Sequence, residues 1–502
     1  MTFPNIVPSR RAFLLGGGAI AAVAAGGYAL KPGMIKADSR FTFDTPLNIP
    51  AVDLGRVEGG VRVFDLDMQA GETEFFDGLK TATKGINGAY LGPVFRVRTG
   101  DVVRMNVRNT LASDTTLHWH GLNVPARADG GPHQVIRAGE VWSPEFEIRD
   151  QAATMWCHSH LMGHTAEQVW AGLAGLIVID DDISDALAVP NEYGVDDIPL
   201  ILQDRRFYRD GSMPYEVSMH DQMAGMTGNI PLVNGTILPF LSVSTQKIRL
   251  RLLNGANASI YHLEFEDGRA FHQIASDGGF LSEPAPMTRL RLAPGERAEI
   301  VVDFRAGQNA LLKSVAANTG RGMGMMMGEQ SPQFDLIEFR PSQDLKPSAD
   351  VPARLAEMPV VLATDAVKTR HFLLEMGGMG MGMGRMMGGG SGFTINGQEM
   401  DMSRVDEVVK LGATEIWEIE NAGPMAHPFH VHNTQFRVLD RDGRPPAAHE
   451  AGRKDTVLVD PGETVRILVR FDHYTDAERP YMYHCHILEH EDAGMMGQFT
   501  VV

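Results

Sequence analysis

The chain is 502 residues long, enough for about three domains of ordinary size, and its formal charge of -18 argues against nucleic acid as a partner. It contains 28 Met and 54 Gly but only 2 Cys, so its stability must come from burial rather than from a framework of disulfides. After residue 30 nothing resembles the roughly 20 consecutive apolar residues that cross a membrane.

The first segment of the chain has the pattern of an export signal. Arg10 and Arg11 precede a Gly- and Ala-rich apolar run that extends to Leu30. Paired arginines ahead of a moderately hydrophobic stretch are typical of twin-arginine signals, which export folded proteins. An uncleaved membrane anchor is the alternative, but the run is short and rich in Gly. We therefore predict that residues 1–37 are a twin-arginine signal segment and that the mature protein is periplasmic, without a membrane span.

From residue 41 onward the sequence consists of short alternating runs broken by Gly, Pro, Asn and Asp. Comparable strand-length runs occur at 102–107, 248–254 and 416–421, and comparable turns that each precede another strand occur at 138–140, 293–298 and 460–464. This order recurs at a period of about 150 residues, which predicts an all-β chain of three consecutive Greek-key β-sandwich domains. The predicted boundaries are 41–182, 190–340 and 355–502.

A low-complexity stretch of Met and Gly at 376–390 lies inside the third predicted domain, and a smaller one at 323–327 lies near the end of the second. Gly in such density opposes both helix and strand, so both stretches are predicted to be loops. Met219, Met223 and Met226 form a third group of methionines, which is a candidate for a further soft-metal patch.

The closing stretch of the chain carries the clearest chemistry. Cys485 lies between His484 and His486, and His490 and Met495 follow at intervals of five residues. Cysteine, histidine and a weak methionine are the ligands of an electron-transferring copper. On a strand, successive side chains point to opposite faces, so the cysteine would face one way and its two neighbours the other. One tripeptide would then connect two metal sites.

Four His-X-His pairs occur, two in the first predicted domain and two in the third. They are His118/His120, His158/His160, His430/His432 and His484/His486. A spacing of two places both rings of a pair on the same face of a strand. The eight imidazoles suffice for one copper with two histidines and a pair of coppers with three each. His427 supplies the remaining imidazole for the mononuclear site with Cys485, His490 and Met495.

With these motifs complete and in order, the chain resembles the three-domain multicopper oxidases over essentially its whole mature length. The resemblance implies three cupredoxin-like domains and four copper ions, with the following ligands: His427, Cys485, His490 and Met495 for type 1; His118 and His430 for type 2; His120, His158 and His486 for one type 3 copper; and His160, His432 and His484 for the other. It also implies four one-electron oxidations of a reductant at type 1 copper. O2 would be reduced to water at a trinuclear centre between the first and third domains.

Two carboxyl groups are candidates for proton transfer to that centre. Glu491 adjoins His490, and Asp129 follows the first histidine pair. In the family, acids at matching positions relay protons, and the alternative is that each is an ordinary solvated acid. A relay acid should give a rate that falls with rising pH and a large loss of rate on change to the amide.

The Met/Gly stretch is the main indication of the reductant, because thioether sulfur prefers Cu(I) to hard cations. A Met-rich insertion in the third domain is similar to that of the periplasmic cuprous oxidases of copper tolerance. Met376 and Met425 match the two methionines of that subfamily's Cu(I) site, whereas Gly423 and Met381 stand where it carries carboxylates. The candidates for binding substrate Cu(I) are Met376, Met379, Met381, Met383 and Met425. Oxidation of Cu(I) is therefore the predicted activity.

Other functions fit parts of the same pattern. A bacterial laccase that oxidises phenols, aromatic amines or bilirubin-like pigments would use the same metals, and a Met-rich copper-sequestering protein would use the methionines alone. Complete trinuclear ligands weigh against sequestration, because storage needs no O2 chemistry. A copper nitrite reductase needs fewer ligands, and a cell-division relative that has lost the metals would lack the motifs. We expect a monomer.

Overall fold

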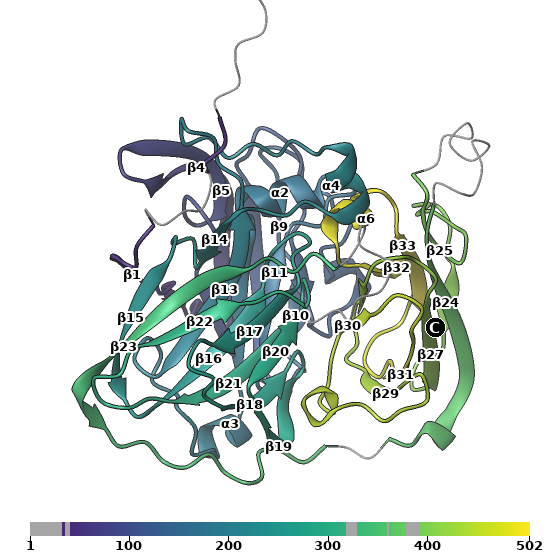
Figure 1. The fold of residues 1–502 in the computed structure, drawn as a ribbon. Coiled ribbons are helices and arrows are strands. Elements are labelled where there is room, and N and C mark those ends of the chain that lie inside the picture. Colours follow the sequence, from purple (N-terminus) through teal and green to yellow (C-terminus); the bar gives the residue numbers. More distant parts are fainter. Residues whose placement is uncertain (1–32, 36–40, 318–328, 359–360, 378–390) are drawn as a thin grey trace, which may run out of the picture.

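The computed structural model describes residues 33–35, 41–317, 329–358, 361–377 and 391–502. Within these ranges the chain forms six β-sheets, arranged as three face-to-face pairs that follow one another along the sequence (Figure 1). The predicted all-β class with cupredoxin-like sandwiches is confirmed. Most of the predicted signal segment, including both arginines, lies outside the described residues, so that segment stays a prediction. In the part that is described, no helix has the length and apolarity needed to cross a membrane.

The first sandwich is formed by residues 52–180. One of its sheets contains β3 (Arg56–Glu58), β4 (Val61–Phe76), β5 (Leu79–Ile86), β7 (Val102–Asn109), β9 (Val141–Trp142) and β10 (Glu145–Glu147), and the other contains β2 (Val52–Asp53), β6 (Val94–Arg98), β8 (His118–His120), β11 (Ala153–His158) and β12 (Ala174–Asp180). Alternating side chains of both sheets, such as Phe64 and Val103 from one and Phe95 and Ile177 from the other, form a single core. Cys157 is fully buried in this core.

The second sandwich has one strand, β1, from the start of the described chain. Its sheets contain β1 (Thr45–Pro46), β15 (Pro239–Thr245), β17 (Tyr261–Phe265), β20 (Arg289–Leu292), β22 (Ala310–Ser314) and β23 (Phe334–Lys346) on one side, and β13 (Asp197–Arg205), β14 (Ile230–Val233), β16 (Lys247–Asn254), β18 (Phe271–Ser276), β19 (Gly279–Met287) and β21 (Arg297–Asp303) on the other. Leu250 of β16 and Leu263 of β17 meet in the core between the two sheets.

The third sandwich closes the chain. Its sheets contain β24 (Ala366–Met376), β25 (Phe393–Ile395), β27 (Thr414–Asn421), β29 (Arg437–Arg441) and β31 (Thr464–Arg470), and β26 (Glu407–Val409), β28 (His427–Val431), β30 (Thr456–Val459), β32 (Asp476–Cys485) and β33 (Met496–Val501). β24 pairs with β25 so that Met376 lies opposite Phe393, and the Met/Gly stretch is therefore the connection of a hairpin. Met379, Met381 and Met383 lie outside the described residues.

The described helices are short and lie in connections between strands. They are α2 (Thr165–Ala171), α3 (Asp182–Ala186), α4 (Met219–Ala224) and α6 (Leu488–Asp492), with 3-10 turns η1 (Ala126–Ala128), η2 (Ala363–Asp365) and η3 (Ala448–Glu450). The first backbone N–H groups of α2, at Thr165 and Ala166, donate to the Asp492 carboxylate at 2.9 Å. This contact joins the first sandwich to the third, beside the segment that carries His490.

The same corner recurs in each sandwich and explains the repeat in the sequence. Asn109, Asn254 and Asn421 end β7, β16 and β27, and each side-chain amide donates to two backbone carbonyls. Each side-chain oxygen accepts from the N–H two residues later, at 2.9, 3.0 and 2.8 Å respectively. The backbone of each asparagine also bonds to a Gly-Glu turn, and these turns are 139–140, 295–296 and 462–463. Asparagine is needed at this corner because one side chain must both donate and accept.

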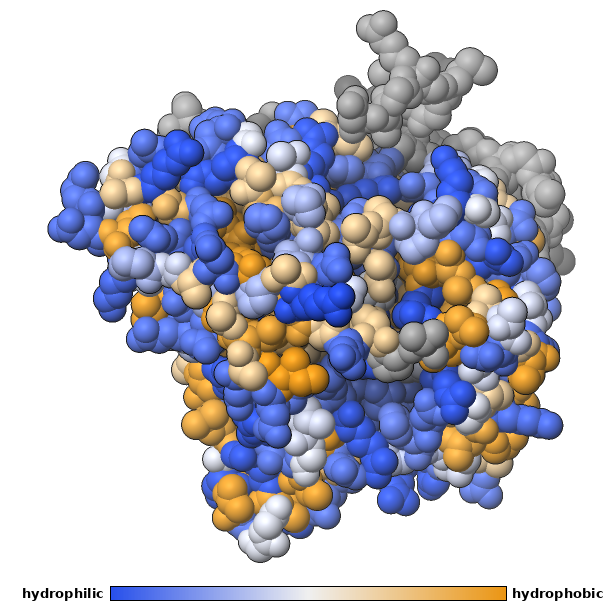
Figure 2. Space-filling model, turned by 90° about the horizontal axis from the view of Figure 1, so that it is seen from below, coloured by the Kyte–Doolittle hydropathy of each residue, from blue (hydrophilic) through white to orange (hydrophobic). Residues whose placement is uncertain are grey.

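The surface is mixed in character. Over the face drawn in Figure 2, hydrophilic residues are interspersed with hydrophobic ones rather than separated from them. Such a distribution is ordinary for a soluble domain surface.

A buried ion network joins the first sandwich to the second. Arg251 donates to Asp197 at 2.7 and 2.9 Å, to Glu299 at 3.0 Å and to the Thr154 hydroxyl at 3.0 Å. Arg249 donates to the other oxygen of Glu299 at 2.8 Å. Burial alone would raise the pKa of the Glu299 carboxyl, but the two guanidinium groups outweigh it and lower that pKa to about 2.

Replacing Glu299 by Gln should lower the free energy of unfolding by about 3 kcal/mol at neutral pH, because Arg249 and Arg251 would remain buried without this carboxylate. The folded pKa of about 2 lies below the unfolded value of roughly 4.3, so this stabilisation is complete above about pH 5 and declines as the pH falls toward 2. Urea unfolding of both proteins across that range measures the difference.

The exposed pair between Arg289 and Glu264, with a hydrogen bond of 2.8 Å, provides the control. Glu264→Gln should change the unfolding free energy by less than about 1 kcal/mol at any pH. A deficit of Glu299→Gln that stays constant between about pH 7 and pH 3 would contradict the assignment of this low pKa to Glu299.

Candidate metal centres

Two pairs of antiparallel strands present the four His-X-His pairs. β8 lies beside β11 with His120 opposite Trp156 and His118 opposite His158. β28 lies beside β32 with His430 opposite His484. The first histidine of each pair lies on a strand, and the second lies on the same strand (His120) or just beyond its end (His160, His432 and His486). Each strand pair therefore directs its imidazoles toward the other sandwich. The first and third sandwiches therefore meet across a layer of histidines.

All eight imidazoles of the four pairs are buried in this layer, which we call the imidazole cluster. Their nitrogens approach within 4.8 Å of one another in three groups: His118, His430 and His432; His120, His158 and His486; and His160, His432 and His484. The closest approaches include His160 Nε2 to His484 Nε2 at 3.2 Å and His120 Nδ1 to His158 Nε2 at 3.4 Å. The residues that sequence reasoning assigned to type 2 and type 3 copper thus lie together.

The nitrogens of the imidazole cluster fit metal ions better than they fit one another. Burial lowers the pKa of His118, His160 and His484 well below the ordinary value, so these rings are neutral and offer lone pairs. Among the described residues, His118 Nε2, His430 Nε2 and both ring nitrogens of His486 are buried without a hydrogen-bond partner. Buried polar atoms nearly always have partners, and bound copper would provide them here.

A second, smaller site lies inside the core of the third sandwich. Cys485 Sγ is 3.3 Å from His427 Nδ1 and 3.8 Å from His490 Nδ1, and all three side chains are fully buried. Met495 is buried in the same core, and its carbonyl accepts from Cys485 N at 3.0 Å. Burial raises the pKa of the Cys485 thiol, which is inert until a cation binds its sulfur. A thiolate with two imidazoles is a ligand set that suits copper.

The two sites are adjacent because of the backbone at the end of β32, where Cys485 is the last strand residue and His486 follows it. Cys485 belongs to the small site, whereas His484 and His486 belong to two different groups of the imidazole cluster. This is the alternation that the two-residue period of a strand requires. The sulfur of Cys485 is therefore covalently connected to each imidazole through the backbone of two adjacent residues.

Both acids expected to serve the centre are buried beside its histidines. The carboxyl oxygens of Glu491 lie 3.2 Å from His160 Nδ1 and 3.2 Å from His484 Nδ1. Asp129 Oδ2 lies 2.8 Å from His432 Nδ1. Burial raises the pKa of both carboxyl groups, and neither is a solvated surface acid.

Two residues in contact with the imidazole cluster were missed by sequence reasoning. Asp455 Oδ1 lies 3.0 Å from His120 Nε2, and the Thr456 hydroxyl lies 3.1 Å from His430 Nδ1. Thr456 begins β30 and Asp455 immediately precedes it, and no histidine spacing or low-complexity pattern marks them in the sequence. Their proximity to His120 follows from the docking of the sandwiches, which a local pattern does not reveal.

The side of the small site that faces away from the imidazole cluster is covered by apolar and sulfur-bearing residues. His490 Nε2 donates to the carbonyl of Met223 on α4 at 3.2 Å, and the Phe393 ring stacks on the His490 ring at 4.3 Å between centroids. A Cβ atom added to Gly423 would lie 3.3 Å from His427 Nε2 and 3.5 Å from Met376 Cγ. A larger side chain at position 423 would therefore press on His427, whereas its distance from Met376 would be an ordinary van der Waals contact.

Comparison with known proteins agrees with this geometry. Two family models described as multicopper oxidase match residues 67–184 and 375–502. The multicopper oxidase mco of Staphylococcus aureus is 36% identical over 454 residues, which are 90% of this chain and 91% of that protein. The cell division protein FtsP of Sodalis glossinidius is 37% identical over 467 residues, 91% of this chain and 93% of that protein.

A similar solved structure is that of the laccase-like multi-copper oxidase CueO from Ochrobactrum sp., described as having oxidase activity towards lignin model compounds and lignosulfonate. It superposes with a TM-score of 0.82 at 39% sequence identity, and the match covers 91% of this chain and 100% of that one. The similarity thus extends over the sandwiches and both candidate metal sites.

Proposed function

Because this chain belongs to the multicopper oxidase family and is therefore an oxidoreductase, we propose that it couples four one-electron oxidations of Cu(I) to the reduction of O2 to water. The observation that carries the proposal is the position of Cys485, whose sulfur lies in one metal site while its two neighbours lie in the other. A protein that only stores copper does not need two metal sites connected through adjacent residues. The ordinary role of such an arrangement is to pass single electrons inward.

We assign four copper ions to the two sites. The ligands are His427, Cys485, His490 and Met495 for type 1; His118 and His430 for type 2; and His120, His158 and His486 with His160, His432 and His484 for the type 3 pair. Copper in these sites supplies one-electron transfer and the reduction of O2. The protein contributes buried imidazoles, a cysteine sulfur, and a core that excludes water from them.

The buried acids are assigned to proton supply. Glu491 lies between His160 and His484 on the outer side of the imidazole cluster, and in the described structure neither of its carboxyl oxygens has a hydrogen-bond partner. Either carboxyl oxygen of Glu491 is therefore available to carry a proton. Asp129 occupies the corresponding position beside His432. Reduction of O2 to water consumes four protons, and both acids are close enough to deliver them to this centre.

Cu(I) is favoured over a large aromatic reductant by the cover of the small site. His427 and His490 are fully buried, and the outward nitrogen of His490 is occupied by the Met223 carbonyl. A phenol would have to displace α4 or Phe393 to reach the His490 ring, whereas a small ion needs only soft ligands near the site. Met376 packs against the same core, and Met425 precedes His427 by two residues. Both thioethers suit Cu(I).

Oxidation of phenols is the second candidate. The Ochrobactrum structure is described as laccase-like, with activity towards lignin model compounds, and the metal ligands here would serve that reaction equally well. A copper-sequestering role and a purely structural role are less well supported, because neither requires eight buried imidazoles with unpartnered nitrogens.

We assign the protein to the periplasm, as a monomer that takes part in copper tolerance. The paired Arg10 and Arg11 ahead of an apolar run support export by the twin-arginine route. Excess copper enters a bacterium through this compartment, where oxidation of Cu(I) would lower its concentration.

Deletion of residues 377–390 should lower the rate of O2 uptake with Cu(I) by at least about tenfold, which corresponds to roughly 1.4 kcal/mol of lost binding. Uptake with a phenolic substrate should stay the same, because the deletion leaves every copper ligand in place. Steady-state O2 consumption with each reductant measures both. Deletion of the other Met-rich stretch, 323–327, is the matched control and should leave both rates unchanged. If the variant without residues 377–390 loses phenol oxidation but keeps Cu(I) oxidation, the proposal of a cuprous oxidase is contradicted.

Glu491→Gln should slow the reoxidation of the reduced enzyme by O2 by about 10²- to 10⁴-fold, because the amide is close in size but does not supply a proton. Reduction of the oxidised enzyme by Cu(I) without O2 should be unaffected. Stopped-flow absorbance measures the two half-reactions separately. Glu489→Gln is the control, since this buried neighbour bonds to Asn257 and Tyr215 rather than to a histidine. Equal reoxidation rates in Glu491→Gln and wild type would remove Glu491 from the proton path.

A further inference from the structure

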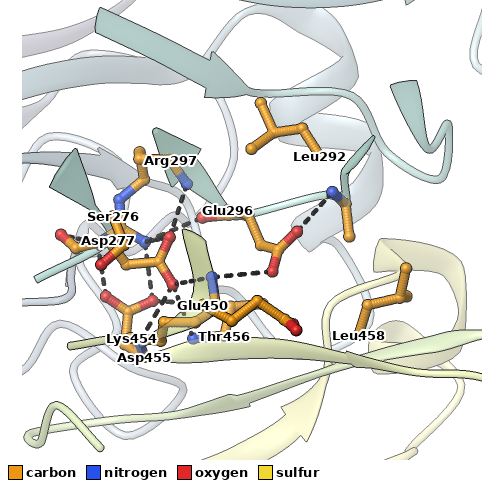
Figure 3. Close-up of polar contacts among 12 residues, drawn as sticks. Ser276, Asp277, Leu292, Glu296, Arg297, Glu450, Lys454, Asp455, Thr456 and Leu458 are labelled. Carbon is orange, nitrogen blue, oxygen red and sulfur yellow. Dashed lines mark hydrogen bonds and ion pairs between the residues drawn. The ribbon is translucent and has the colours of Figure 1, made fainter. Parts of the chain in front are cut away.

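Arg297 connects all three sandwiches through one fully buried guanidinium group, and Figure 3 shows its side chain beside Asp455. It belongs to β21 of the second sandwich, which contributes none of the four histidine pairs. Its Nε donates to the carbonyl of Thr154 in the first sandwich at 3.0 Å, and Nη1 donates to the carbonyl of Gly295 in its own sandwich at 3.0 Å. Nη1 and Nη2 donate to both carboxylate oxygens of Asp455 in the third sandwich at 2.8 and 2.5 Å.

The Asp455 end of this contact reaches two imidazoles. The Asp455 oxygen that accepts from Arg297 Nη1 also lies 3.0 Å from His120 Nε2, so the other nitrogen of that ring faces the imidazole cluster. The backbone carbonyl of Asp455 accepts from His430 Nδ1 at 2.9 Å, which turns His430 Nε2 inward. A carboxylate bonded to the outer nitrogen of a ligand histidine fixes both the tautomer and the ring orientation.

The Gly295 end reaches a third imidazole. Gly295 has φ of +83°, and a Cβ atom there would lie 2.9 Å from His486 Cδ2, so bare backbone packs directly on the ring. The corresponding glycines of the other two sandwiches, Gly139 and Gly462, have nothing within 4 Å of such a Cβ atom. Since neither nitrogen of His486 has a hydrogen-bond partner in the described structure, packing confines the ring, with Gly295 against it and the rings of His120 and Trp156 nearby.

The charged groups near Arg297 pair mainly with one another, and its guanidinium group pairs with Asp455. Lys454 lies 3.1 Å from Asp277 Oδ2 and 3.0 Å from Glu296 Oε1, and so supplies the cation for those two acids (Figure 3). Asp277 Oδ1 accepts the backbone N–H of Arg297 at 2.8 Å and lies 3.8 Å from Nη1, and Nη2 donates to the backbone carbonyl of Asp277 at 3.1 Å. Asp455 and Arg297 therefore form the one bidentate ion pair of the group shown. Bidentate pairs have the most restrictive geometry of protein ion pairs.

We infer that Arg297 is a positioning residue for the imidazole cluster. Through Asp455 it orients His120 and His430, and through the carbonyl of Gly295 it holds the turn that confines His486. The inference rests on the proposed copper ligation by these histidines. Without Arg297, Asp455 is a buried carboxylate with no cation, and it turns toward the imidazoles. Lysine does not substitute, because one ammonium group has neither the reach nor the planar fork to bond both Asp455 oxygens and two carbonyls.

Arg297→Met and Arg297→Lys in the copper-loaded enzyme test the inference, with Arg251→Met as the matched control. Arg251 is an equally buried arginine of the second sandwich that pairs with Asp197 and Glu299 and touches no imidazole. Copper retained per chain is measured against increasing chelator, and electron paramagnetic resonance records the type 2 signal. The Arg297 variants should lose copper at roughly 10- to 100-fold lower chelator concentration and show an altered type 2 hyperfine splitting. The blue absorption of type 1 copper should remain.

Arg251→Met should lower the thermal midpoint while its type 2 signal and chelator resistance stay those of wild type. Wild-type spectra in both Arg297 variants would overturn the inference, and so would equal spectral changes in the Arg251 variant. If neither Arg297 variant folds, Asp455→Asn replaces them. Its amide places a donor toward Arg297 and should shift the type 2 signal, and an unchanged signal would again overturn the inference. Wild-type enzyme that binds no type 2 copper would instead refute the proposed function.

Discussion

The structure depends on the burial of eight imidazoles in one layer between two sandwiches. A buried polar atom without a partner costs about 1–3 kcal/mol, and several nitrogens of this layer lack one in the described structure. Such an arrangement is maintained only if the surrounding fold is rigid and if a bound metal supplies the missing partners. The three sandwiches, the ion networks between them and the two strand pairs that carry the histidines all serve this requirement.

The sandwiches contribute unequally to it. The first and third carry the histidine pairs on strands of the same design, β8 with β11 and β28 with β32. The second carries no ligand, yet its corner turn packs on His486 and its Arg297 compensates the carboxylate behind His120. The corners that close β7 and β27 make no such contact, whereas the corner at Gly295 packs on the ring of His486. A repeated unit has thus been specialised where it meets the imidazole cluster.

How far the sequence predicts this protein follows from the range of each interaction. The histidine spacing and the position of Cys485 depend only on the two-residue period of a strand, so the grouping of ligand candidates could be predicted. The sandwich repeat was also visible, because the asparagine corner and its Gly-Glu turn recur in order. Asp455, Arg297 and the Met223 carbonyl were not predictable, since their contacts arise only when separate sandwiches dock. The binding of substrate Cu(I) by the Met/Gly stretch stays a prediction, because Met379, Met381 and Met383 lie outside the described residues.

The most direct test of the account is the copper content of active enzyme together with its consumption of Cu(I) per O2. If two sites joined by Cys485 pass single electrons to O2, active enzyme contains four copper ions per chain. It then oxidises four Cu(I) for each O2 and releases no hydrogen peroxide. A copper content well short of four in active enzyme, or peroxide as the product, would contradict it.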